Sequence, residues 1–287
     1  MNELELVRRL ARLQSSGPGV VLGIGDDAAI FRPSGGEDLV FTTDMFIEDV
    51  HFRRRTHSAE DAGYKAMARG LSDIAAMGAW PRFCLLSIAL APWAKQRWFE
   101  GFVKGVRQFD VPLIGGDLSH SDRVAADIVV CGGVPKGEAL SRFGAQPGDT
   151  ICVSGPLGAS ALGLRTKSGE AWERHMRPEP RLAMGVTLRG KASAAMDLSD
   201  GLSIDLKRLC EASGVAAELD REPPRFPGAK LDDALHGGED YELLFTLPPK
   251  VRRPPRTTAI GRIVEGKPGS VTFLGEPLPA RGYQHFR

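Results

Sequence analysis

The sequence is poor in cysteine and contains no Cys-x-x-Cys pair. Its four cysteines, Cys84, Cys131, Cys152 and Cys210, are scattered along 287 residues. This spacing disfavours a zinc ribbon, and three of the four lie in apolar runs that are typical of strands. We therefore expect buried thiols that act as small apolar side chains in a reducing compartment.

Long hydrophobic runs and an excess of one charge are also missing. The apolar run CLLSIALAPW is about half as long as a membrane span. The first residues, MNELELVRRL, lack the apolar core of a signal peptide. The formal net charge is +1, which gives no overall field to attract nucleic acid or an anionic membrane. These absences predict a cytoplasmic protein with neither a nucleic-acid nor a membrane partner.

The hydropathy pattern predicts a mixed α/β protein with two domains. In the first half, the β-like runs VVLG, LVFTTD, CLLSIAL and ADIVVCGGV alternate with helices expected over residues 58–79 and 94–109. Ser58 is the expected N-cap of the first helix. The stretch PKGEALSRFGAQPGDT is rich in glycine and proline and has no periodicity. We place the boundary there, between a domain of residues 1–137 and a domain of residues 138–287.

The second half repeats the alternation of strands and helices. It begins with a strand in ICVSG, and two further strands are expected in VAAELD and ELLFTL. Short β-like runs near residues 258–264 and 271–274 close the chain. The helices are expected over residues 159–166, 180–191 and 203–212.

Two glycine-containing stretches come close to phosphate-binding loops but lack the required context. GIGDDA, residues 23–28, fits the relaxed dinucleotide pattern Gly-x-Gly-x-x-Ala, yet no long helix follows it and its two carboxylates would repel a pyrophosphate. GVTLRGKA, residues 185–192, ends in alanine where a P-loop has a hydroxyl. We interpret the second stretch as a helix end, with Gly190 as its C-terminal glycine.

Acidic residues recur in one kind of setting. Each follows a strand, lies near a glycine turn or precedes a helix, except for one that lies within a helix of small residues. They are Asp27, Asp44, Asp73, Asp117, Asp197, Asp200 and Glu239. Taken singly, most fit an ordinary turn or N-cap, but Asp73 lies in mid-helix beside Ala75 and Ala76.

Convergence of these acids would require cations to offset their mutual repulsion. The hydroxyls of Thr42 and Thr43 precede Asp44, and no histidine or cysteine cluster accompanies the acids. An all-oxygen set favours Mg²⁺ over zinc. Because Mg²⁺ commonly completes its shell with substrate phosphates and water, the pattern indicates nucleotide chemistry without a P-loop.

In their order and spacing, the acidic motifs resemble those of the thiamine-monophosphate kinase family. The similarity extends from Gly23 to the final GYQHF, which is nearly the whole chain. The motifs are GIGDDAA, TTDMFIEDVHF, LSDIAAMGA, IGGD, SRFGAQPGD, MDLSDGLSIDL and GGEDYELLF. GGEDYELLF together with VHF is specific to this family, whereas GIGDDAA and IGGD mark only the wider superfamily of aminoimidazole ribonucleotide synthetase.

The resemblance implies a two-domain, aminoimidazole ribonucleotide synthetase-like α/β fold, with mixed sheets packed with helices. It also implies a homodimer. In each subunit, the N-terminal domain would bind ATP and Mg²⁺ and form the dimer contact, and the C-terminal domain would complete the substrate site. The implied reaction is ATP-dependent phosphorylation of thiamine monophosphate to thiamine diphosphate on several Mg²⁺ ions. The attacking phosphate oxygen is already anionic at neutral pH, so no acid–base residue is assigned.

Each implied role belongs to a numbered residue of this chain. The ligands of Mg²⁺ would be Asp27, Thr42, Thr43, Asp44, Asp73, Asp117, Asp197 and Asp200. The contacts with ATP would come from Gly116, Asp117, Arg142 and Ser199. Thiamine monophosphate would contact His51, Glu239 and Tyr283. The one departure from the family is a compact region between Pro248 and Gly269, in a chain that is short for the family.

Two other functions stay open at the level of the sequence. One is another ATP-dependent reaction of the same superfamily. Selenophosphate synthesis is disfavoured because no reactive cysteine lies near the N-terminus and Cys84 falls in an apolar run. The other is a catalytically silent nucleotide-binding protein, against which the retention of every acidic motif argues.

Overall fold

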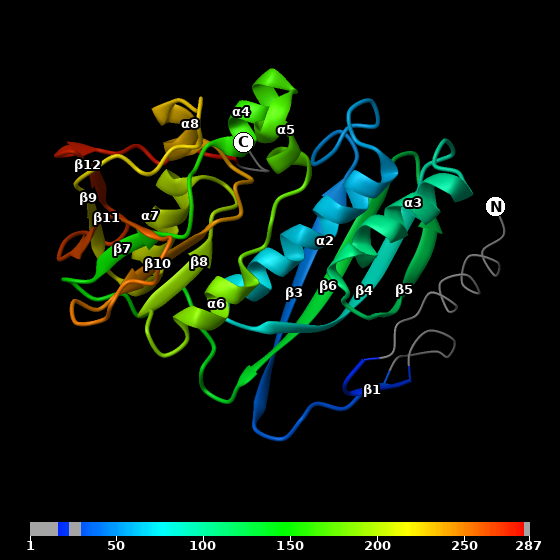
Figure 1. The fold of residues 1–287 in the computed structure, drawn as a ribbon, viewed down its shortest axis with the longest axis horizontal. Coiled ribbons are helices and arrows are strands. Elements are labelled where there is room, and N and C mark those ends of the chain that lie inside the picture. The colour runs from blue at the N-terminus through cyan, green and yellow to red at the C-terminus, as the bar shows by residue number, and fades with distance from the viewer. Residues whose placement is uncertain (1–16, 23–29, 284–287) are drawn as a thin grey trace. The chain divides into compact units, whose positions relative to one another are not determined.

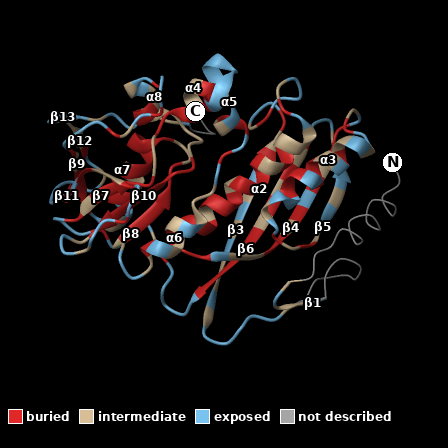
Figure 2. Ribbon diagram, in the orientation of Figure 1, coloured by how far each residue is buried: buried red, intermediate tan, exposed pale blue. Residues whose placement is uncertain are grey.

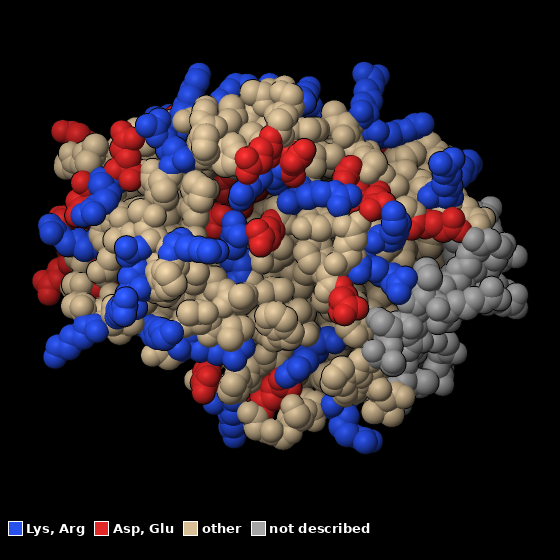
Figure 3. Space-filling view, viewed as in Figure 1, with Lys and Arg blue, Asp and Glu red and all other residues tan. Residues whose placement is uncertain are grey.

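The structure, a computed structural model, describes residues 17–22 and 30–283 and forms two compact units (Figure 1). The first unit comprises Met1–Ile74 and Trp80–Gly137, and the second comprises Ala75–Ala79 and Glu138–Arg287. Side chains of both charge signs lie over the face shown in Figure 3. None of the described helices has the length and apolar character that a membrane crossing requires.

A four-stranded sheet with the strand order β3-β6-β4-β5 forms the centre of the first unit. β4 and β5 are parallel, and the other neighbours are antiparallel. A small antiparallel pair, β1 with β2, precedes the sheet. The elements are β1 Val20–Leu22, β2 Ile30–Phe31, β3 Glu37–Ile47, α2 Ala59–Ala76, β4 Trp80–Leu90, α3 Gln96–Val106, the 3₁₀ helix η1 Arg107–Phe109, β5 Leu113–His120 and β6 Ala125–Pro135.

Only one face of this sheet is well buried. Along β3 the exposed residues Phe41, Thr43 and Met45 alternate with less exposed ones, because successive strand residues point to opposite faces. Helices α2 and α3 lie over the sheet (Figure 1), and the helix faces toward the sheet are buried (Figure 2). At Gly63, a Cβ atom would lie 1.9 Å from the carbonyl oxygen of Phe102, so α2 and α3 touch backbone to backbone.

The second unit contains a seven-stranded sheet with the order β13-β12-β9-β11-β7-β10-β8. Only β12 and β9 pair in parallel. The strands are β7 Thr150–Val153, β8 Ala194–Asp197, β9 Ala216–Leu219, β10 Leu243–Leu247, β11 Thr258–Val264, β12 Val271–Phe273 and β13 Glu276–Pro277. The helices are α4 Ala159–Thr166, α5 Gly169–Met176, α6 Leu182–Leu188, α7 Leu202–Ser213 and α8 Leu231–His236.

The central strands of this sheet are buried on both faces. In β7, Ile151 and Val153 pack into one apolar cluster, while Cys152 between them packs into another. All five residues of β10 are buried. The four cysteines are all free and buried, as expected, and burial raises the pKa of the Cys84 thiol to about 12.

Most predicted elements are confirmed, and their ends show why they stop. The first long helix covers Ala59–Ala76, and Ser58 caps it, since the backbone N–H of Asp61 donates to Ser58 Oγ at 3.1 Å. The second ends earlier than expected, because a 3₁₀ turn replaces its last residues. Gly190 follows α6 with a φ of +64°, as expected for a C-terminal glycine.

The expectation that Asp117 follows a strand at a glycine turn was wrong. Strand β5 runs through this motif and continues to His120. The reason for glycine at position 116 is a close strand approach, since a Cβ atom there would lie 1.8 Å from the carbonyl oxygen of Leu86 on β4. Gly116 and Asp117 therefore lie within an edge strand of the sheet.

Candidate active site

One group of predicted site residues lies between β3 and α2 in the first unit. Thr42 Oγ1 donates a hydrogen bond of 2.5 Å to Asp73 Oδ2. Asp44 Oδ1 accepts a hydrogen bond of 2.6 Å from the guanidinium of Arg69, which also donates to the carbonyl oxygen of Met45. Arg69 and Asp73 are four residues apart, so they share one face of the helix. Asp73 therefore points toward the strand that carries the predicted ligands.

A second group lies on the other face of the same sheet. Thr43 Oγ1 donates to Asp127 Oδ1 at 2.6 Å. The strand register aligns Asp117 with Ser87, Asp127 and Met45 in one row, and residues in such a row share a face. Thr43 and Asp117 are thus separated by the sheet from Thr42, Asp44 and Asp73. The sequence did not predict Asp127 as a site residue, because it is an ordinary polar residue at the start of an apolar strand.

His51 lies in the turn that follows β3. Its Nδ1 atom accepts a hydrogen bond of 3.0 Å from the backbone N–H of Ile47, an arrangement that leaves the proton of a neutral imidazole on Nε2. The ring stacks on Phe46, with 5.9 Å between ring centroids. These contacts fix the orientation of the imidazole, and its contact with substrate remains a prediction.

In the second unit, two predicted loops are joined by backbone hydrogen bonds. The N–H of Leu198 donates to the carbonyl of Glu242 at 2.8 Å, and the N–H of Tyr241 donates back to Leu198 at 3.0 Å. The N–H of Glu239 donates to the carbonyl of Ser199 at 2.7 Å. The structure therefore brings the MDLSDGLSIDL motif, with Asp197 at the end of β8, against GGEDYELLF.

Asp200 lies in a network of charges at the start of α7. Its Oδ2 atom accepts a hydrogen bond of 2.5 Å from Arg208, which also binds Asp205 at 2.9 Å. Asp205 accepts hydrogen bonds from the backbone N–H groups of Asp200 and Gly201. Burial raises the pKa of Asp205 to about 6, although the hydrogen bonds from these N–H groups and the positive charge of Arg208 act to lower it. Asp205 thereby fixes the backbone that presents Asp200.

The C-terminal segment reaches the same loop. The backbone N–H of Tyr283 donates to the carbonyl of Asp200 at 3.3 Å, and 45% of Tyr283 is exposed. Arg142 belongs to the same unit, but its side chain is exposed and donates no hydrogen bond to any described residue. Its carbonyl accepts from Ser213 Oγ at 3.1 Å. Tyr283 is thus placed beside the acidic loop, whereas Arg142 is anchored only through its backbone.

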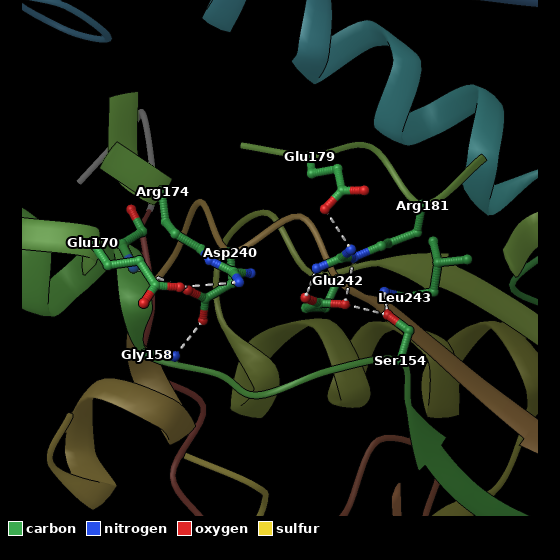
Figure 4. A network of polar contacts seen from close by, with 10 residues as sticks. Ser154, Gly158, Glu170, Arg174, Glu179, Arg181, Asp240, Glu242 and Leu243 are labelled. Atoms are coloured by element: carbon green, nitrogen blue, oxygen red, sulfur yellow. Dashed lines mark hydrogen bonds and ion pairs between the residues drawn. The ribbon is translucent and has the colours of Figure 1, made fainter. Parts of the chain in front are cut away.

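Glu239 has contacts that the sequence did not predict. Its Oε2 atom lies 3.5 Å from Nδ1 of His175, which is 4% exposed. The same nitrogen lies 2.9 Å from Ser160 Oγ. Asp240 and Glu242, on either side of Tyr241, bind other parts of the same unit (Figure 4). His175 lies in α5, whose sequence GEAWERHM is rich in charged residues and contains no apolar run that would have marked it as an element.

The donor chemistry of the described residues fits Mg²⁺. Thr42 and Asp73 place a hydroxyl and a carboxylate together, while Asp197 ends strand β8 and Asp200 follows it closely in the chain. These are oxygen donors, as Mg²⁺ prefers. Within residues 17–22 and 30–283, no three acidic, histidine or cysteine side chains form a ready metal cluster. Asp27 lies outside the described residues.

The chain matches two protein-family models in sequence order. Residues 25–137 match the AIR synthase related protein, N-terminal domain, and residues 146–272 match the AIR synthase related protein, C-terminal domain. The fold and the paired acidic loops thus define an AIR synthase-related protein with two α/β domains, which confirms the expected fold class.

Full-length comparisons narrow this class to one family. Thiamine-monophosphate kinase of Escherichia coli (strain K12) is 38% identical over 320 residues, which cover 98% of this chain and 97% of that protein. The crystal structure of thiamine-monophosphate kinase from Stenotrophomonas maltophilia K279a has a TM-score of 0.83 at 36% identity, with 96% of each chain covered. AaThiL complexed with AMPPCP and TMP has a TM-score of 0.81 at 29% identity, with 99% of this chain and 96% of that chain covered. This chain belongs to the thiamine-monophosphate kinase family.

Proposed function

We propose that the protein transfers the γ-phosphoryl group of ATP to thiamine monophosphate and forms thiamine diphosphate and ADP. The observation that carries the proposal is the hydrogen-bonded pairing of the Asp197–Asp200 loop with the Glu239 loop in one unit. It places predicted metal and nucleotide ligands beside a predicted substrate residue. The similarity over 99% of this chain to AaThiL, whose structure holds AMPPCP and TMP, supports the same pair of substrates.

The transfer needs no general base. An anionic phosphate oxygen of thiamine monophosphate forms the new bond to the γ-phosphorus, and the bond from that phosphorus to the β,γ-bridging oxygen breaks. The electron pair leaves with ADP. The obstacle is the repulsion between two polyanions, which several Mg²⁺ ions neutralise when bound. The contribution of the protein is to position the substrates and to place charge beside them.

Each predicted residue has a part in that positioning. The oxygen donors that would hold Mg²⁺ are Asp27, Thr42, Thr43, Asp44, Asp73, Asp117, Asp197 and Asp200. Gly116, Arg142 and Ser199, together with Asp117, would bind ATP. His51, Glu239 and Tyr283 would orient thiamine monophosphate.

A homodimer in the cytoplasm is part of the same proposal. The face of β3 that α2 does not cover exposes Phe41 to 61% and Met45 to 49%. Large exposed apolar side chains on one sheet face are typical of an interaction surface. The four free, buried thiols fit a reducing compartment.

The direct test is the incubation of the purified protein with ATP, Mg²⁺ and thiamine monophosphate. The proposal predicts thiamine diphosphate and ADP in equal amounts. If ADP forms only with a different acceptor, the protein catalyses another reaction of the superfamily. If ATP binds and no acceptor is phosphorylated, the protein is a silent nucleotide-binding protein.

A further inference from the structure

Asp240 connects the Glu239 segment, Gly237–Leu243, to the first turn of α4. Its carboxylate accepts hydrogen bonds from the backbone N–H groups of Gly158, at 2.6 Å, and Ser160, at 3.1 Å. The N-cap residue of α4, Gly158, provides no side-chain cap. A carboxylate from a distant part of the chain therefore satisfies N–H groups that would otherwise lack partners.

Glu242 is held by a second and stronger set of contacts (Figure 4). It is 1% exposed, and Arg181 binds both its oxygens, through Nε at 2.9 Å and Nη2 at 2.5 Å. Ser154 Oγ donates to Glu242 Oε2 at 2.5 Å and accepts from the N–H of Leu243 at 2.7 Å. A buried carboxylate with a bidentate arginine and a hydroxyl is well compensated, and the loss of either partner would leave a buried charge.

Glu239 differs from these two acids. Its side chain is 29% exposed, and its backbone has a φ of +63°, while Tyr241 has a φ of +51°. Residues other than glycine adopt this left-handed region at an energetic cost, and the surrounding structure must impose it. The anchors at Asp240 and Glu242 alternate with the two left-handed residues, so they are placed to impose that conformation.

We propose that Arg181, Glu242 and Asp240 are positioning residues, which hold the Glu239 segment in its left-handed conformation and so aim Glu239 at the thiamine part of the substrate. This inference rests on the proposed function for its substrate, but the anchoring itself does not. Arg181 and Glu242 would act without touching the substrate. Burial, with a smaller contribution from Glu242, raises the pKa of Asp240 to about 7, while the hydrogen bonds from the N–H groups of Gly158 and Ser160 act to lower it.

The chain offers a matched control pair for the experiment. Arg262 binds Glu218 Oε2 through Nε at 3.0 Å and Nη2 at 2.6 Å. This pair also joins an arginine to a glutamate within the second unit, but its side chains are 62% and 42% exposed. Exposed ion pairs contribute little, so Glu218→Gln reports the effect of an amide substitution without the loss of a buried anchor.

The first measurement is amide hydrogen exchange of the folded proteins, without substrate, in the wild type, Glu242→Gln, Arg181→Lys and Glu218→Gln. We expect exchange in the Glu239 segment to become about tenfold faster or more in Glu242→Gln, with a smaller increase in Arg181→Lys, because lysine keeps the charge but loses the bidentate geometry. Glu218→Gln should match the wild type in this segment. Unchanged exchange in both anchor variants would overturn the proposal, and Arg181→Lys tests it if Glu242→Gln fails to fold.

The second measurement separates positioning from a purely structural role. In Glu242→Gln and Arg181→Lys, the KM for thiamine monophosphate should rise about ten- to a hundredfold, as expected for a misplaced binding group, while the KM for ATP changes little. If exchange accelerates but the KM for thiamine monophosphate stays constant, the anchors are structural and the inference is wrong. If the wild type has no kinase activity but amide exchange is faster in the anchor variants than in the wild type, the proposed function is wrong and the anchoring is still supported.

Discussion

Asp44 is the predicted Mg²⁺ ligand whose substitution tests the metal site most directly. It lies on the face of β3 that contacts α2, and Arg69 binds one of its carboxylate oxygens at 2.6 Å. This pairing offsets part of its negative charge and fixes its orientation. A cation that Asp44 helps to hold would therefore meet a carboxylate that is already oriented.

Asp44→Asn should lower kcat/KM about a hundredfold or more, since it removes a charged ligand and keeps the shape of the side chain. The measurement is ADP release with thiamine monophosphate, together with circular dichroism to show that the fold is retained. Asp122→Asn, at an exposed position of the same unit, is the control and should turn over like the wild type. Wild-type turnover in Asp44→Asn would contradict the assignment.

Asp240 should make stability depend on pH. Burial raises its pKa from 3.8 to about 7 in the folded protein. The folded state therefore binds more protons than the unfolded chain between about pH 4 and pH 7, and the free energy of unfolding falls as the pH rises through this window. Asp240→Asn removes this titration.

Urea denaturation of the wild type and of Asp240→Asn at several pH values measures the effect. The free energy of unfolding of the wild type minus that of the variant should fall by about 2 to 3 kcal/mol between pH 5 and pH 8. A difference that does not change with pH would show that Asp240 keeps an ordinary pKa.

At the scale of elements, the contact between α2 and α3 depends on a missing side chain. Gly63 faces the backbone of Phe102, so Gly63→Ala would force the two helices apart. We expect a loss of about 2 kcal/mol or more in the free energy of unfolding, measured with urea. At Gly35 a Cβ atom would meet nothing within 4 Å, so Gly35→Ala should stay close to the wild type. Equal stability of the two variants would contradict the tight packing.

The elements that the sequence predicted are those with a clear period or a strong apolar run. The helix expected over residues 203–212 is present as Leu202–Ser213, and the one expected over residues 159–166 has those bounds. Helices α5 and α8 and strand β8 were not predicted. Their sequences, GEAWERHM, LDDALH and AAMD, contain no run of β-branched or large apolar residues that would have marked them.

The acids of the candidate site could be found in the sequence, but their supporting residues could not. Each acid lies in a short local motif, whereas its partners come from far along the chain. Arg181 binds a carboxylate 61 residues away, and Ser154 binds the same one from 88 residues away. Only the fold brings such pairs together.

At the scale of the whole molecule, the exposed face of β3 predicts association. We expect a homodimer in light scattering coupled to size-exclusion chromatography. Phe41→Asp, on this face, should shift the protein toward the monomer because it places a charge in an apolar interface. Leu274→Asp, at another exposed apolar position with 57% exposure, should leave the dimer intact. A dimer that survives Phe41→Asp would assign the interface to a different surface.

We propose that the paired acidic loops of the second unit serve phosphoryl transfer to thiamine monophosphate. The most direct measurement follows the products of ATP, Mg²⁺ and thiamine monophosphate by ³¹P NMR. We predict that the resonances of thiamine diphosphate and ADP grow together in equal amounts, and that neither grows when thiamine monophosphate is left out. The appearance of ADP without thiamine diphosphate, or no turnover at all from folded protein that binds both substrates, would contradict this role of the loops.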